Sequence, residues 1–212
     1  MPGAETGSAQ GSAGIDLPLA SGFDLNNAAF FIAPFRYATF ERCLDSDVAE
    51  RLLLWFESTA PWHHVETDFY EQHEFSCWDS AAPEAASLTS EDLLGALRAE
   101  MTRLFGCHFR PDVSVVAHRL VPGHRIGIHN DYLVGQETHR FVVQLNRGLS
   151  DPDGGFFMLF SSSDAADVHK VIRPASLSAL AFEISPSSYH AISQMHGNVR
   201  YSIVFSFYAS TD

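Results

Sequence analysis

The chain has 212 residues, of which 46% are apolar, and its 17 Phe are sufficient for the core of one substantial domain. No stretch approaches the roughly 18 consecutive apolar residues of a membrane span, and the first residues lack the basic and apolar runs of a secretory signal. The net charge of −13 comes without any cluster of Lys and Arg. We therefore expect neither a membrane nor a nucleic acid as partner.

The three cysteines, Cys43, Cys77 and Cys107, are odd in number, widely spaced and without a Cys-x-x-Cys motif. This pattern disfavours a disulfide framework and a cysteine-rich zinc site. Free thiols suit a reducing compartment, so the sequence predicts a cytoplasmic protein.

The first half of the chain predicts a tail followed by a strand and a helix. Residues 1–20 are rich in Gly, Ala and Ser and are expected to form a flexible tail. Residues 30–42 predict an early strand with aromatic packing. Residues 44–59 predict a helix that begins with a capping box of Asp47 and Glu50.

Two further segments complete the first half. Residues 61–80 mix aromatic and polar side chains, which fits either a strand pair or a loop over a cleft. Residues 89–106 predict a second helix, which begins at Thr89 or Ser90 and ends at Gly106.

From Val113 onward, short runs of β-branched and aromatic residues alternate with turn signals. Seven or eight strands at this spacing predict an all-β sandwich, barrel or jelly roll. We expect a single domain over residues 21–212. In it, a mixed helical part (21–112) packs against a β-core (113–212).

The stretch PGHRIGIHND places His129 and Asp131 two residues apart after a Pro-Gly turn. Side chains two apart on an extended chain point to the same side, so this pair can hold one metal ion. The motif alone is weak, since His64 and Glu66 repeat its spacing. The alternative is an ordinary contact between a histidine and a carboxylate.

Two later strands supply partners for this pair. His190 lies at the start of a short apolar strand, and two histidines with one carboxylate leave three positions of an Fe(II) ion open. Arg200, on the last strand, can hold a carboxylate with two guanidinium nitrogens. Ser202 lies on the same side of that strand and can add a hydrogen bond.

The order of His129, Asp131, His190 and Arg200 resembles the Fe(II)/2-oxoglutarate-dependent oxygenases, most closely their prolyl-hydroxylase-like branch. The segments VPGHRIGIHND, RFVVQLN and DGGFFMLF are similar to successive strands of that branch. The resemblance covers roughly residues 113–208.

The resemblance implies a mainly β fold with flanking helices and a double-stranded β-helix, the jelly-roll or cupin-like core. It also implies Fe(II) as cofactor, with 2-oxoglutarate and O2 as co-substrates. It makes His129, Asp131 and His190 the metal ligands, with no catalytic residue beyond them. Arg200 and Ser202 are implied to bind 2-oxoglutarate.

The chain departs from the family pattern at two positions. Many relatives have a tyrosine where this chain has Gln144, and Gln144 can still donate a hydrogen bond to the co-substrate. Val121 replaces a tyrosine often found before Pro-Gly. The intact Asp131 favours hydroxylation over halogenation, because related halogenases have Gly or Ala there. Desaturation and ring formation stay open.

Other polar residues have less specific interpretations. Arg125 and Arg140 flank the metal-binding strands, where each can bind a substrate carboxylate or phosphate or form a structural ion pair. A second metal site made of His63, His64 and His73 is disfavoured.

Together these observations predict a biosynthetic dioxygenase. It would hydroxylate an unactivated C–H bond of a small molecule, such as an amino acid or a natural-product intermediate, releasing succinate and CO2. The compact chain without a substrate-recruiting domain motivates the small-molecule substrate. One alternative is a prolyl-type hydroxylase of a peptide or protein. The other is a cupin-like protein that binds metal without turnover.

Overall fold

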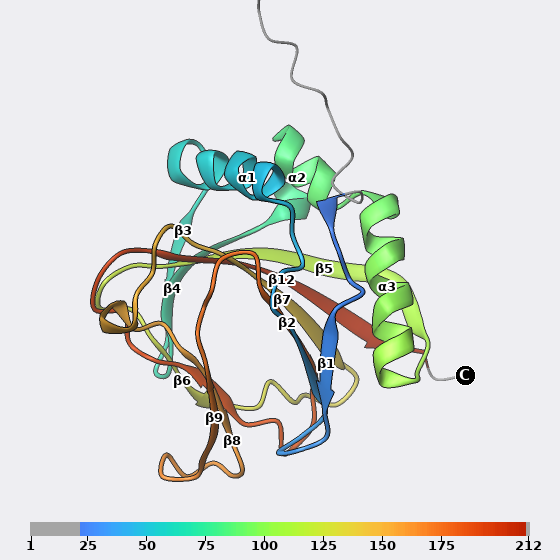
Figure 1. The fold of residues 1–212 in the computed structure, drawn as a ribbon, viewed down its shortest axis with the longest axis vertical. Coiled ribbons are helices and arrows are strands. Elements are labelled where there is room, and N and C mark those ends of the chain that lie inside the picture. Colours follow the sequence, from blue (N-terminus) through green and yellow to red (C-terminus); the bar gives the residue numbers. More distant parts are fainter. Residues whose placement is uncertain (1–21, 211–212) are drawn as a thin grey trace, which may run out of the picture.

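The strands of the computed structural model, which describes residues 22–210, form two antiparallel sheets (Figure 1). The larger sheet has the order β1-β2-β10-β7-β12-β5-β4-β3, and the smaller has the order β6-β11-β8-β9. The strands are β1 (Ala28–Phe31), β2 (Tyr37–Phe40), β3 (His63–Glu66), β4 (Glu71–Ser76), β5 (Phe109–Leu120), β6 (Ile126–His129), β7 (His139–Leu145), β8 (Phe157–Phe160), β9 (Val168–Ile172), β10 (Ala179–Glu183), β11 (His190–Ile192) and β12 (Arg200–Ala209). The predicted tail, residues 1–20, lies outside the described residues.

Strands from the first half of the chain extend the larger sheet at both ends. The β1–β2 pair joins it through β10, and the β3–β4 hairpin joins it through β5. Strand pairing is therefore not confined to residues 113–212. Residues 30–42 form parts of two strands rather than one, because the chain turns between β1 and β2 and the two pair antiparallel. For residues 61–80, the strand-pair alternative is confirmed.

Both predicted helices are present, although the first begins differently from the prediction. Helix α1 (Ser46–Ser58) is capped by Asp45, whose carboxylate accepts hydrogen bonds from the backbone N–H groups of Asp47 and Val48. The capping box at Asp47 was wrong, because Asp47 already lies inside the first turn, where its own N–H needs an acceptor.

Helix α3 (Glu91–Phe105) begins after Ser90, which makes no side-chain capping bond, and ends at Gly106 with a φ of 71°. That left-handed conformation favours glycine. The short helix α2 (Pro83–Leu88) was not predicted, because six residues are too few to show a helical period. Within residues 22–210, no helix has the length and apolar character needed to cross a membrane.

Two hydrophobic cores lie on opposite faces of the larger sheet. Helices α1 to α3 cover one face, and the smaller sheet lies against the other (Figure 1). Side chains of β12 alternate between them, so that Ile203 and Phe205 join the helical core while Val204 joins the other. Arg200 and Ser202 share the side of Val204. The alternation of β12 thus aims its polar residues into the space between the sheets.

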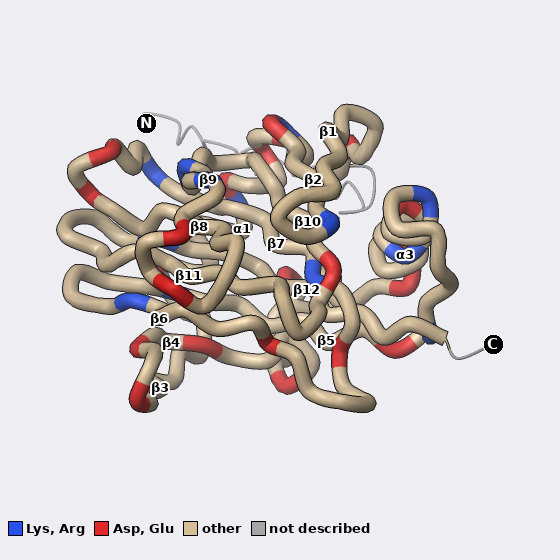
Figure 2. The backbone as a smooth tube through the Cα atoms, turned by 90° about the horizontal axis from the view of Figure 1, so that it is seen from below, with Lys and Arg blue, Asp and Glu red and all other residues tan. Residues whose placement is uncertain are grey.

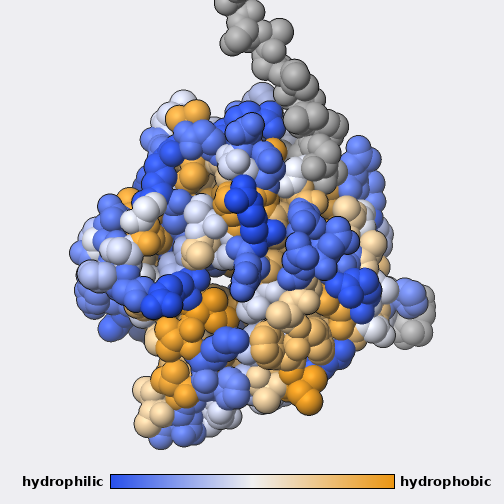
Figure 3. Space-filling model, in the orientation of Figure 1, coloured by the Kyte–Doolittle hydropathy of each residue, from blue (hydrophilic) through white to orange (hydrophobic). Residues whose placement is uncertain are grey.

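Charged and apolar surface are distributed unevenly. Figure 2 shows Lys and Arg scattered along the described chain rather than gathered, which fits the acidic composition. Figure 3 shows apolar surface on the lower part of the face seen in Figure 1, in the region of β8 and β9. Val168 and Val171 of β9 are among the exposed apolar side chains.

One buried histidine predicts how stability depends on pH. His139 packs edge-on against the rings of Phe105 and Phe109, and burial together with the nearby Arg36 charge lowers its pKa to about 4. In the unfolded chain the pKa of a histidine is near 6.5. Between about pH 4 and pH 6.5 the unfolded chain therefore binds a proton at this residue that the folded chain does not bind. Stability is therefore lost as the pH falls from about 6.5 towards 4.

We expect this residue to contribute about 3 kcal/mol of the acid-induced loss in unfolding free energy. Urea denaturation at several pH values would measure it. His139→Phe keeps an aromatic side chain without the titration, so its free energy of unfolding should fall less over the same range. Equal slopes for the two proteins would contradict the assignment.

Candidate functional site

The three residues predicted as metal ligands meet in the structure. His129 ends β6 and His190 begins β11, and the two are direct partners in the antiparallel pairing of these strands. Asp131 follows two residues after His129. Its Oδ1 lies 3.3 Å from Nε2 of His129, and its Oδ2 lies 3.1 Å from Nε2 of His190. Two strand residues and one residue just beyond β6 therefore place their donor atoms around one point.

Hydrogen bonds on the far side of each ring set the orientation of the imidazoles. Nδ1 of His129 lies 2.8 Å from the carbonyl of Gly127, and Nδ1 of His190 lies 2.8 Å from the carbonyl of Ser188. A carbonyl only accepts, so each Nδ1 carries the proton. In the neutral ring, each Nε2 then presents a lone pair to the centre, the arrangement typical of metal-ligating histidines.

The carboxylate of Asp131 is held ionised. Burial by itself would raise its pKa, but any imidazole that carries a proton on Nε2, together with the Arg140 guanidinium, holds the pKa well below its usual range. Nη1 of Arg140 lies 2.7 Å from Oδ2 of Asp131, and Arg140 also pairs with Glu137. Despite this ion pair, Oδ2 is buried without a well-aligned hydrogen bond. An ionised ligand oxygen of this kind fits a bound cation.

Arg200 lies in the cavity that the two histidines line, together with Ser202. It is only 2% exposed, and no carboxylate of the described residues pairs with it. Its Nε finds no hydrogen-bond partner among the residues that the structure describes, and Nη1 is 3.5 Å from Oγ of Ser202. Burial lowers its pKa to about 10, so the guanidinium remains charged at neutral pH. A buried cation without a counterion is costly, and a bound carboxylate would compensate for that cost.

The remaining predicted residues are divided between this cavity and other places. Gln144 is buried directly opposite Ser202 in the pairing of β7 with β12, and its Oε1 has no partner. Arg140 lines the cavity through its contact with Asp131. Arg125 is exposed and does not line the cavity, although its backbone carbonyl accepts a hydrogen bond from the N–H of Glu71.

His118 is a cavity residue that the sequence did not single out. It lies on β5 opposite Ser202 and lines the cavity with Arg140 and Arg200. Burial and the charges of these two arginines lower its pKa to about 3, so the ring is neutral. His118 could have been identified only from the pairing of its strand with the last strand, and a single sequence does not reveal that pairing.

A hydroxyl group connects the two segments that carry the ligands. Ser188 is fully buried, and its Oγ lies 2.9 Å from the carbonyl of Asn130, the residue between His129 and Asp131. We expect Ser188→Ala to weaken Fe(II) or Co(II) affinity about 10–100-fold, the usual effect of losing a support of the ligands. Anaerobic metal titration would measure it, with the exposed Ser187→Ala as control. Equal affinities of both variants would refute the role.

Comparison with solved structures gives the fold. No protein-family model and no curated protein matches the sequence. A prolyl-4-hydroxylase of Pseudomonas putida is similar at a TM-score of 0.66 and 17% identity, over 81% of this chain and 91% of that one.

Two further structures agree with this likeness. A Trichoplax adhaerens prolyl hydroxylase, in complex with a hypoxia inducible factor peptide fragment, gives a TM-score of 0.65 at 14% identity, over 81% and 83% of the two chains. A 2OG-Fe(II) oxygenase family protein of Burkholderia pseudomallei gives 0.58 at 16%, over 77% and 80%. The chain therefore has the jelly-roll fold of the 2-oxoglutarate- and Fe(II)-dependent oxygenases, as its sequence predicted.

Proposed function

We propose that this protein is an Fe(II)- and 2-oxoglutarate-dependent dioxygenase that hydroxylates an unactivated C–H bond. One observation carries the proposal. A single cavity contains two histidines of a two-histidine, one-carboxylate set, and it also contains a buried arginine that has no acidic partner among residues 22–210. The first feature suits Fe(II), and the second suits the distal carboxylate of 2-oxoglutarate. The fold, shared with prolyl hydroxylases, supports the same assignment.

The residues have distinct roles in this proposal. His129, Asp131 and His190 hold the iron, while Arg200 and Ser202 bind the carboxylate of 2-oxoglutarate. When bound, the iron and 2-oxoglutarate would activate O2, of which one oxygen atom would enter the substrate C–H bond and the other would enter succinate, with release of CO2.

The rest of the cavity supports these groups. Arg140 keeps Asp131 ionised, which is the form that binds metal. Phe157 and Phe182 add apolar walls against the ring of His190, which limits water around the reacting centre.

The substrate would approach along a groove that adjoins the metal site. Asp131 and Arg140 line this groove, and beyond them it continues past Leu133 and Tyr208 into a second hollow. Leu133 and Val134 are 68% and 87% exposed, an unusual position for apolar side chains. This open, partly apolar surface favours a peptide substrate over the free small molecule that the sequence predicts. The cytoplasmic location and the biosynthetic role stay predictions.

The proposal is tested by anaerobic titration of the protein with Fe(II) and then 2-oxoglutarate, followed by visible absorption. We expect a charge-transfer band that requires both additions, because only chelation of the iron by 2-oxoglutarate produces it. Bound iron without the band would overturn the oxygenase and favour the cupin-like binding protein. Succinate release in the presence of peptides, compared with free amino acids, would then separate the two substrate classes.

A further inference from the structure

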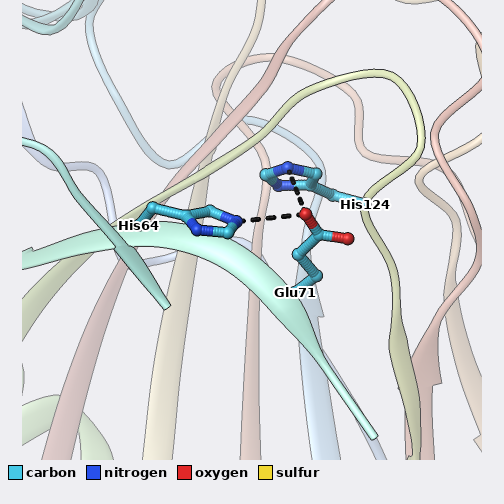
Figure 4. Close-up of side chains that lie close together, drawn as sticks. All are labelled: His64, Glu71 and His124. Atoms are coloured by element: carbon cyan, nitrogen blue, oxygen red, sulfur yellow. Dashed lines mark hydrogen bonds and ion pairs between the residues drawn. The ribbon is translucent and has the colours of Figure 1, made fainter. Parts of the chain in front are cut away.

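A second group of metal-ligating side chains lies apart from the first. We call it the hairpin cluster; it consists of His64, Glu71 and His124 (Figure 4). Oε1 of Glu71 lies 3.0 Å from Nε2 of His64 and 3.3 Å from Nε2 of His124. Within residues 22–210, this cluster and the triad at Asp131 are the two groups whose ligand atoms all lie within 4.8 Å of one another.

The backbone explains why these side chains converge. In the β3–β4 hairpin, His64 pairs with His73 and Glu66 pairs with Glu71, so all four side chains share one face. His63, one residue earlier, points to the opposite face, which is why the trio of His63, His64 and His73 does not form.

His124 reaches the same face from the turn between β5 and β6. Its N–H donates to the carbonyl of Val121, its carbonyl accepts from Met195, and the next residue, Arg125, accepts from the N–H of Glu71. These backbone hydrogen bonds hold the ring of His124 over the hairpin. Two of the three ligands are thus placed by the hairpin strands, and the third by a turn that backbone hydrogen bonds hold in place.

The electrostatic surroundings favour neutral imidazoles beside a negative charge. His124 is only 6% exposed, and its ring stacks on that of His73 at 5.1 Å. Burial, the neighbouring histidines and Arg119 lower the pKa of both rings, and the neutral form is the one that binds metal. Glu71 and Glu66 oppose the positive charge of Arg119 near these rings.

The distances match a metal site. Zinc binds histidine nitrogen and carboxylate oxygen at about 2.0–2.2 Å, and a tetrahedron of that size has edges of about 3.3–3.6 Å. The two contacts to Glu71 are this short or slightly shorter. We propose that the hairpin cluster is a second metal site, for Zn(II) or a similar divalent ion, with water in the remaining position. Zinc is favoured over Fe(II) because mixed nitrogen and oxygen sites bind it more tightly.

The site would fasten the hairpin to the segment that leads to the first triad. The turn of the hairpin carries Phe69, whose carbonyl accepts from the N–H of Gly127 at 2.6 Å and whose ring lies 5.5 Å from that of His129. A metal at the hairpin cluster would hold both sides of this contact together. The inference rests on these side chains alone and does not depend on the oxygenase function.

Zinc content after equilibrium dialysis tests the proposal. We expect wild type to retain one zinc ion at each cluster, and both Glu71→Gln and His64→Ala to lose one of the two. Asp131→Gly removes the ligand of the other triad and should also lose one, whereas Asp131→Gly with Glu71→Gln should lose both. His63→Ala is the matched control, since it removes a histidine from the opposite face of the same strand.

Thermal unfolding gives a readout that needs no activity. Zinc should raise the Tm of Asp131→Gly but not that of Asp131→Gly with His64→Ala, whose half-exposed side chain is not needed for folding. Zinc content unchanged by Glu71→Gln and His64→Ala would overturn the site and leave Glu71 as an acceptor of two imidazole N–H groups. An equal loss in His63→Ala would show adventitious surface binding and overturn it as well.

Discussion

Arg200→Met is expected to weaken 2-oxoglutarate binding by at least about 100-fold while raising the stability of the protein without ligand. The weaker binding follows because two charge-assisted hydrogen bonds to the carboxylate are lost, each worth about 1.5–3 kcal/mol. The higher stability follows because a buried guanidinium, which no carboxylate in the described part of the chain pairs with, is replaced by an apolar side chain of similar length. Titration of the charge-transfer band and thermal unfolding measure the two effects.

The expected fall in 2-oxoglutarate affinity and the expected rise in stability together distinguish a ligand-binding arginine from a structural one. A purely structural arginine would show lower stability in Arg200→Met and no selective change in 2-oxoglutarate affinity. Arg173→Met is the control, since Arg173 is exposed and paired with Asp151. It should change neither quantity. Unchanged affinity in Arg200→Met would remove Arg200 from the binding site, whatever the stability shows.

His190→Ala is expected to abolish turnover and the charge-transfer band together. The residue is 3% exposed, and its Nε2 is one of the three donor atoms of the proposed metal site. The loss of metal affinity in His190→Ala should be larger than the about 10–100-fold loss expected when a residue that only supports the ligands, such as Ser188, is removed. Anaerobic iron titration and succinate release provide the measurements.

The exposed His196→Ala, in the loop after β11, is the matched control and should behave as wild type. Imidazole added to His190→Ala offers a second check, since it fills the cavity with the missing ligand. A His190→Ala protein that turns over at the wild-type rate would exclude His190 from the metal site.

The sequence predicted the residues of the site better than the surroundings of the site. His129, Asp131, His190 and Arg200 lie on or next to strands at recognisable spacings, and their order resembles a known family, which grouped them before the structure brought them together. His118 escaped because its place beside Ser202 depends on a pairing between strands more than eighty positions apart. Pairing across that separation leaves no trace in local periodicity.

The fold shows the same division. Long periodic segments, such as those of α1 and α3, were predicted from their apolar stripes and end signals. The sequence did not decide whether the β3–β4 segment is a strand pair or a loop. One face of this hairpin carries the titratable side chains of His64, Glu66, Glu71 and His73, so the segment lacks a clear alternation of apolar and polar residues. The hairpin cluster was missed for a related reason, since His124 joins the hairpin only through the fold.

The backbone of Asp131 gives the site an evolutionary asymmetry. Its φ of 56° is left-handed, a conformation that costs an ordinary side chain about 1 kcal/mol and glycine almost nothing. Removing the carboxylate by mutation to glycine is therefore better tolerated by the fold than removal by mutation to alanine. Loss of this carboxylate, and with it any change of chemistry at the proposed metal site, therefore costs the least folding stability when it occurs through glycine.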